Sequence, residues 1–118
     1  MQKVNLEEKY QLFSDQWSPK EIAQVNDHLV KVAKVQGEYF WHSHEDVDEL
    51  FLVHKGELRI QFRDGEVILR AGELLVVPRG VEHCPVAEEE VELILIEPGS
   101  IDSAGREKRG YSIEDETI

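Results

Sequence analysis

The feature that most constrains the fold is a series of short apolar runs, each of which stops at a glycine or a proline. The run at 57–63 alternates apolar and polar residues, as a strand with one buried face does. Asp-Gly pairs are strong hairpin signals. Between residues 49 and 78 the breaks fall at Gly56, Asp64-Gly65, Ala71-Gly72 and Pro78. Short strands at such close spacing predict an all-β antiparallel sandwich or barrel.

The flanking segments extend the same pattern. We predict a strand at 21–25, a turn at 26–27 and a strand at 28–36, because β-branched residues surround an Asn-Asp pair. The sequence at 18–21 also matches a helix capping box with proline at the first helical position. The stretch after it is short and β-branched, which favours the strand. The last strand is predicted at 91–96.

The two ends of the chain differ from this centre. Residues 1–20 contain apolar residues at helical spacing, which fits a short amphipathic turn or an irregular arm packed on the barrel. Residues 100–118 are polar and predict a loose tail. We therefore expect one domain over 1–118, with the barrel core at about 21–99.

Composition excludes several classes of partner. The chain has 13 basic and 25 acidic residues, a net charge of −12, which disfavours nucleic acid and anionic membrane surfaces. No apolar stretch approaches the ~20 residues of a membrane helix, and the N-terminus lacks the apolar run of a secretory signal. Cys84 is the single cysteine, so an intramolecular disulfide is impossible and a cytoplasmic location is expected.

Three histidines and one glutamate form a candidate metal site. His42 and His44 are two residues apart, so on a strand they share a face. Glu49 opens the next apolar run, and His83 follows the turn signal at 78–80. Imidazole nitrogens and a carboxylate oxygen that converge from different strands suit a divalent first-row metal.

These residues resemble the two sequence motifs of small single-domain bacterial cupins. The first motif is a glycine, His-x-His, a glutamate and a closing glycine; here it consists of Gly37, His42, His44, Glu49 and Gly56. The second is a glycine, Pro-x-Gly and a histidine; here it consists of Gly72, Pro78-Arg79-Gly80 and His83. Two positions depart from the pattern, since Gly37 is one residue nearer His42 than usual and Ala87 replaces the usual asparagine.

The resemblance implies a jelly-roll β-barrel and a specific ligand set. The four ligand positions of the family fall on His42, His44, Glu49 and His83. It implies one divalent transition metal per chain, whether Fe, Mn, Ni, Zn, Co or Cu, because ligands alone do not select among them. Small cupins commonly pair, so a homodimer is expected.

The remaining candidates favour structural roles. His28 and His54 are predicted not to be ligands, and Asp48 is the nearest alternative carboxylate to Glu49. Cys84 is expected to pack as a small apolar residue. Arg79 lies in the turn near His83, where it would meet an anionic ligand or, as we favour, simply face solvent.

Strand alternation also predicts which side chains line the barrel and which face outward. Tyr39 and Trp41 are expected to face outward, either at a dimer interface near Trp41 or beneath the N-terminal arm. The positions predicted to face inward are apolar, namely Phe40, Phe51, Val53, Leu58, Ile60, Phe62, Val76, Leu93 and Leu95. This lining offers no obvious acid–base group.

Three functional hypotheses follow. The first is a metal-dependent oxygenase that acts on a small molecule in the barrel mouth, with an isomerase as the weaker enzymatic version because no proton shuttle is evident. The second is a module that binds a small ligand or a metal without turnover. The third is a barrel in which the metal only ties strands together. The fold does not decide among them.

Overall fold

The computed structural model describes residues 1–99 and 115–118, which form one short helix and eight strands. No helix in these two ranges is long and apolar enough to cross a membrane. The elements in chain order are α1 (Leu6–Tyr10), β1 (Lys20–Val25), β2 (His28–Glu38), β3 (Glu49–Lys55), β4 (Glu57–Phe62), β5 (Gly65–Arg70), β6 (Leu74–Val77), β7 (His83–Pro98) and β8 (Glu116–Thr117).

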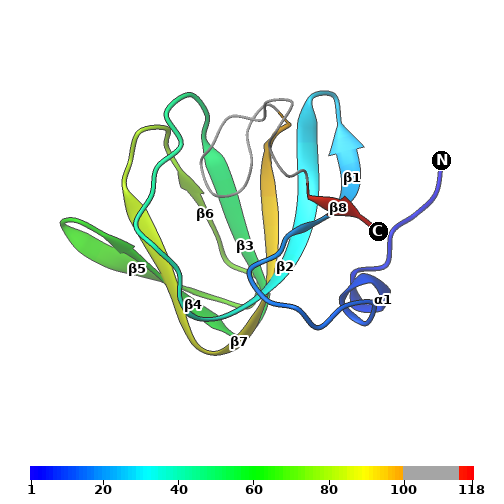
Figure 1. Ribbon diagram of the computed structural model, residues 1–118, viewed down its shortest axis with the longest axis horizontal. Coiled ribbons are helices and arrows are strands. Elements are labelled where there is room, and N and C mark those ends of the chain that lie inside the picture. The colour runs from blue at the N-terminus through cyan, green and yellow to red at the C-terminus, as the bar shows by residue number, and fades with distance from the viewer. Residues whose placement is uncertain (100–114) are drawn as a thin grey trace.

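The strands form one strongly curved, mainly antiparallel sheet. Its order is β5-β4-β7-β2-β1-β8, and β3 joins β7 to the short strand β6. Strand β7 pairs with β2 on one edge, and on its other edge first with β4 and then with β3. Figure 1 shows β4 and β5 at one end of the molecule and β1 and β2 at the other. The architecture is the predicted jelly roll, although the sheet does not close into a complete barrel.

The two faces of the sheet bury different clusters. The inner face holds the larger core, which includes Phe51, Leu58, Ile60, Leu93 and Leu95. On the outer face, Tyr10 of α1 packs against Val32 and Ile94. The Tyr10 hydroxyl donates a hydrogen bond of 2.7 Å to the carbonyl oxygen of Leu93, which fixes the helix on β7.

The structure confirms the predicted hairpin and resolves the N-terminal lead-in. Strands β1 and β2 meet at a two-residue turn, and no helix follows the capping-box sequence. Within residues 1–20, only Leu6–Tyr10 is helical; Asn5 caps this helix by accepting a hydrogen bond from the Glu8 N–H. Trp17 has a φ of 57°, so the helical spacing noted in the sequence does not extend to it.

The predicted C-terminal tail is described only at its last residues. Positions 100–114 lie outside the described residues. Beyond them, Glu116–Thr117 forms β8, which pairs in parallel with the start of β1, and Ile118 packs on the outer cluster. At 115–118 the chain is therefore part of the sheet rather than loose.

Two of the predicted inward positions are wrong. Phe40 is 49% exposed, because 39–48 is an irregular connection in which strand alternation does not apply. Val76 is 46% exposed, whereas Val77 is buried. The pairing of Glu49 with Val77 sets this register, and the sequence could not show it because 74–77 is apolar at every position.

We predict that Gly56 is more sensitive to substitution than Gly72. Both have a left-handed φ, 97° and 85°, so alanine costs about 1–2 kcal/mol at either position. At Gly56 an added Cβ also meets the Val91 Cγ2 atom at 3.1 Å, whereas at Gly72 nothing lies within 4 Å. Gly56→Ala should lower the free energy of unfolding by about 2–4 kcal/mol in urea titrations. Equal losses in Gly56→Ala and Gly72→Ala would contradict the close packing against β7.

Candidate metal centre

The four predicted ligand residues come from three places in the chain that the backbone ties together. His42 and His44 lie in the irregular connection before β3, Glu49 is the first residue of β3, and His83 is the first residue of β7. The backbones of His42 and His83 form an isolated β-bridge, with N–H···O distances of 3.1 and 2.9 Å. The Gly80 N–H also donates to the carbonyl oxygen of His44 at 2.8 Å. The turn before β7 thus holds the His-x-His segment in place.

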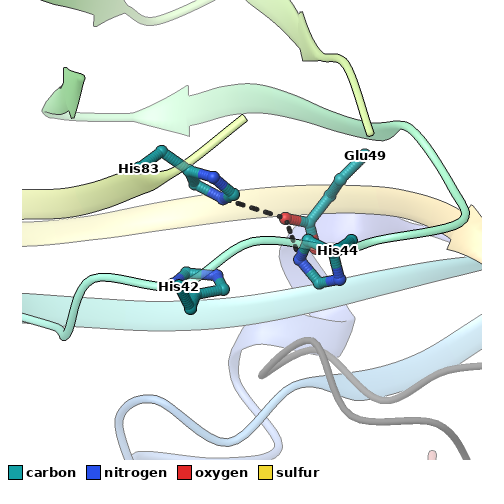
Figure 2. A group of neighbouring side chains, drawn as sticks. All are labelled: His42, His44, Glu49 and His83. Carbon is teal, nitrogen blue, oxygen red and sulfur yellow. Dashed lines mark hydrogen bonds and ion pairs between the residues drawn. The ribbon is translucent and has the colours of Figure 1, made fainter. Parts of the chain in front are cut away.

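The side chains of these four residues converge inside the sheet. One ligand atom from each lies within 4.8 Å of the others, and Figure 2 shows the rings grouped about the Glu49 carboxylate. His44 Nε2 is 3.1 Å from Glu49 Oε1, and His83 Nε2 is 3.7 Å from the same oxygen. His44, Glu49 and His83 are almost fully buried, while His42 is partly exposed.

Backbone carbonyls orient two of the imidazoles. His42 Nδ1 lies 2.9 Å from the carbonyl oxygen of Phe40, and His83 Nδ1 lies 2.9 Å from that of Val81. A carbonyl only accepts hydrogen bonds, so each Nδ1 carries the proton and each Nε2 keeps its lone pair. This is the arrangement in which outer hydrogen bonds prepare histidines for a metal.

The donor set fits a divalent metal. Among the described residues, the buried His83 Nε2 has no hydrogen-bond partner, as expected for an atom with a lone pair reserved for an ion. Two ligands about 2.1 Å from one ion lie at most ~4.2 Å apart. The four ligand atoms lie within 4.8 Å of one another, about 0.6 Å above this limit, so the side chains would close slightly around one ion. Three imidazoles and one carboxylate suit several first-row dications.

Electrostatics favour the protonation states that a metal needs. Burial raises the pKa of Glu49, but the hydrogen bond with His44 Nε2 and the nearby imidazole of His83 outweigh burial and hold that pKa well below its usual range. Burial lowers the pKa of His42, so its imidazole stays neutral to a lower pH than an exposed histidine. An ionised carboxylate and a neutral imidazole are the forms that bind a dication.

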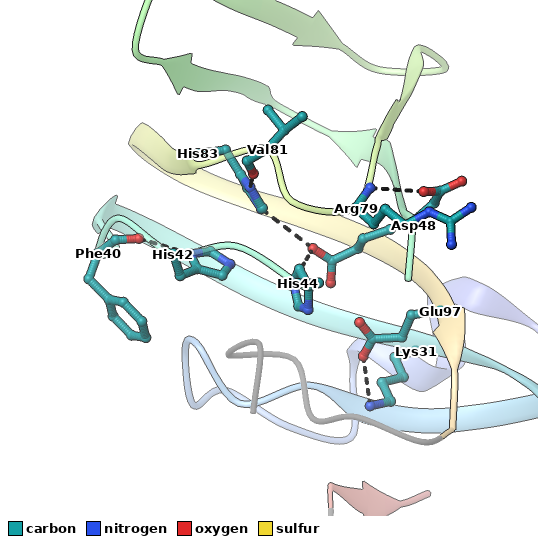
Figure 3. A network of polar contacts seen from close by, with 10 residues as sticks. Lys31, Phe40, His42, His44, Asp48, Arg79, Val81, His83 and Glu97 are labelled. Atoms are coloured by element: carbon teal, nitrogen blue, oxygen red, sulfur yellow. Dashed lines mark hydrogen bonds and ion pairs between the residues drawn. The ribbon is translucent and has the colours of Figure 1, made fainter. Parts of the chain in front are cut away.

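Two buried charged residues beside the cluster were missed by the sequence analysis. Lys31 and Glu97 are both fully buried, and Lys31 Nζ donates to Glu97 Oε1 at 2.9 Å (Figure 3). Burial and the charge of Glu49 raise the pKa of Glu97, and the ammonium of Lys31 opposes this rise. Strand alternation was the available signal, since Lys31 shares its parity with Ala33 and Glu97 shares its parity with Leu95.

A small cavity of about 40 Å³ adjoins the cluster. His42 and Glu49 are on its wall, and the rest of the lining is mainly apolar: Trp17, Pro19, Ala33, Val35, Tyr39, Phe51, Pro85, Leu93 and Leu95. Trp17 stacks on Tyr39 with ring centroids 4.7 Å apart, and the indole N–H donates to the Gln36 carbonyl oxygen at 2.9 Å. The N-terminal arm therefore forms part of the cavity wall.

The alternative site residues have other partners. Asp48 is exposed and accepts a hydrogen bond of 2.9 Å from the backbone N–H of Arg79, so it braces the turn before His83. His28 is exposed next to Asp27. His54 stacks on Tyr10 and groups with Glu7 and Glu92, on the side of the sheet covered by α1.

Cys84 is fully buried, as predicted, and burial raises the pKa of its thiol, which keeps it protonated. Tyr39 does not face outward as predicted, because residues 39–48 are an irregular connection; it lines the inner cavity, where Trp17 of the N-terminal arm stacks on it. The Arg63 guanidinium lies 3.9 Å from the ring centroid of Trp41. A homodimer near Trp41 stays a prediction.

Comparison with known proteins identifies the family. The family model of the cupin domain matches residues 28–97. A cupin-2 domain protein from Shewanella frigidimarina has a crystal structure that superposes with a TM-score of 0.80 at 49% identity, over 80% of this chain and 93% of that one.

Two curated relatives match parts of the chain. YdbB of Bacillus subtilis is 51% identical over 63 residues, and a Saccharolobus solfataricus protein named as a dioxygenase is 32% identical over 81 residues. These matches cover 52% and 65% of this chain, but only 56% and 21% of the two relatives. The domain match and the structural similarity together show that this chain belongs to the cupin domain family.

Proposed function

We propose that this protein binds one divalent transition metal through His42, His44, Glu49 and His83, and acts as a metal-dependent oxygenase on a small molecule. The observation that carries the proposal is the convergence of three imidazoles and one buried carboxylate beside an apolar cavity. The name of the Saccharolobus relative supports the oxygenase class.

Different residues of the chain would have different roles at this site. A bound metal would supply Lewis acidity and a coordination position for dioxygen or for a chelating oxygen of the substrate. His42 and Glu49 hold the metal side of the cavity. Phe51 and Leu95 exclude water from it, and Trp17 and Tyr39 form the wall at the N-terminal arm.

The cavity supports a second candidate, a module that binds a metal or a very small ligand without turnover. Its volume of about 40 Å³ holds only a few water molecules, whereas ligand pockets typically reach about 300 Å³ or more. A larger substrate would need the Trp17–Tyr39 pair to move apart. A purely structural metal is less well supported, because the cavity reaches two of the four ligand residues.

The first test is metal stoichiometry. Protein purified without chelators or a histidine tag should contain one equivalent of a divalent transition metal, measured by elemental analysis. His44→Ala should lose most of it, because a buried ligand is removed. His28→Ala, which removes an exposed histidine, is the control and should keep the full equivalent. Equal metal content in the two variants would overturn the assigned ligands.

The second test is pH dependence. Metal binding needs the neutral imidazole, so protons compete as pH falls, and affinity should drop about tenfold per pH unit for each imidazole that takes up a proton. Burial lowers the pKa of His42, so its contribution to this loss should begin below the ordinary histidine value of ~6.5. Equilibrium dialysis should show metal retained at about pH 7.5 and released at about pH 4. Full retention at the lower pH would refute imidazole ligation.

The third test is turnover. With diketone, flavonol and thiol candidates, the metal-loaded protein should consume dioxygen when a suitable substrate is present, measured with an oxygen electrode. His44→Ala should abolish this uptake and His28→Ala should preserve it. Metal-loaded protein that consumes no dioxygen with any of these substrate classes would favour the binding module.

A further inference from the structure

The strand register places three ionisable side chains in a row across the inner face. Leu50 of β3 pairs with Ile96 of β7, so Glu49 and Glu97 are the next positions along their strands. Glu97 pairs in turn with Leu29 of β2, and Lys31 is two residues further along on the same face. Glu49, Glu97 and Lys31 thus occupy adjacent strands, and Figure 3 shows the Lys31–Glu97 pair beside the histidine cluster.

Lys31 is a cation with no access to water. Its side chain is 0% exposed, and its ammonium group bonds Glu97 Oε1 at 2.9 Å and Asp115 Oδ2 at 2.6 Å. A buried charge without such partners would be strongly destabilising. Asp115 adjoins β8, so Lys31 also ties the last described residues of the chain to β2.

This cation is a potential competitor of the metal. An ammonium group close to Glu49 would attract the carboxylate that the metal needs and would repel the metal itself. Glu97 lies between the two, because β7 separates β3 from β2 in the sheet. The row, with Asp115, holds three carboxylates and one ammonium group.

We propose that Glu97 is a positioning residue that engages Lys31 and thereby leaves Glu49 free to bind the metal. The inference rests on the metal binding proposed above. Lys31 serves the fold by holding Asp115, and Glu97 keeps the positive charge of Lys31 from acting on the metal centre. Glu97 touches neither the metal nor a substrate in this role.

The test is the order of metal affinities in a charge-swap series. Co(II) dissociation constants should be measured by competition with a chromophoric chelator. Glu97→Gln removes the carboxylate between Lys31 and Glu49. It should weaken Co(II) binding about 10- to 100-fold, the range typical when a residue next to the metal-ligating side chains is replaced. Glu89→Gln removes the same charge at an exposed position of the same strand, and it should stay within about twofold of wild type.

The double variant Lys31→Met/Glu97→Gln separates this role from a structural one. It removes both charges, so wild-type affinity and the wild-type visible spectrum of bound Co(II) should return. A folded double variant that binds as weakly as Glu97→Gln, or a Glu97→Gln variant with wild-type affinity, would overturn the proposal. If Glu97→Gln does not fold, the double variant still decides, because it must match wild type.

The same Co(II) measurements distinguish a failure of the proposed role of Glu97 from a failure of the proposed metal binding. Wild-type protein that binds no Co(II) overturns both proposals. Wild-type binding that is lost in His44→Ala but unchanged in Glu97→Gln overturns only the role of Glu97.

Discussion

The pairing of β7 is the constraint on which the rest of the structure depends. This strand of 16 residues pairs with β2 along one edge and shares its other edge between β4 and β3. A strand shared in this way joins the parts of the sheet and gives them one curved inner face. His83 begins the strand and Glu97 lies near its end. The same strand therefore carries a candidate ligand and the carboxylate beside the cluster.

The inner face can bury ionisable groups because these groups form ion pairs and hydrogen bonds with one another. A lone buried carboxylate or ammonium group costs several kcal/mol, whereas a paired and hydrogen-bonded set costs much less. The Glu49 carboxylate lies within 4 Å of the His44 and His83 imidazoles, and the Lys31 ammonium group bonds Glu97 and Asp115. The rest of the face is apolar, with Leu93 and Leu95 directly beside these groups on β7. Among the described residues, His44 Nδ1, His83 Nε2 and Glu97 Oε2 are buried without a hydrogen-bond partner, so the set leaves atoms available to an ion.

Much of the fold could be predicted from the sequence wherever polar and apolar residues alternate. The run at 57–63 has one buried face, and Leu58 and Ile60 are indeed buried. Alternation gives no answer in the all-apolar run at 74–77, and the prediction that Val76 faces inward is therefore wrong. Alternation also fails in the irregular connection at 39–48, where Phe40 is exposed and a bridge between His42 and His83 holds the backbone.

The four candidate ligand residues could be predicted from the sequence, whereas the charged residues beside them could not. The resemblance to the two cupin motifs predicts the four positions, and the structure brings their side chains together. The roles of Lys31 and Glu97 depend on which strands are neighbours, and that is a property of long-range pairing. A lysine or glutamate on a strand is ordinarily placed on the solvent side. For Lys31 and Glu97, alternation with buried residues indicates the inner face. The sequence does not show which charged partner each residue has across the sheet.

The register of β7 determines the positions of both the histidine–glutamate cluster and the row of buried charges. Side chains alternate between the two faces, so a slip of one residue against β2 and β3 would turn both His83 and Glu97 to the outer face. The same slip would leave Lys31 and Glu49 facing each other without Glu97 between them. The apolar residues Leu93 and Leu95, which must stay inside, therefore hold the polar groups in place as well. Hydrophobic burial along one strand fixes the register, and the register in turn fixes the charges around the site.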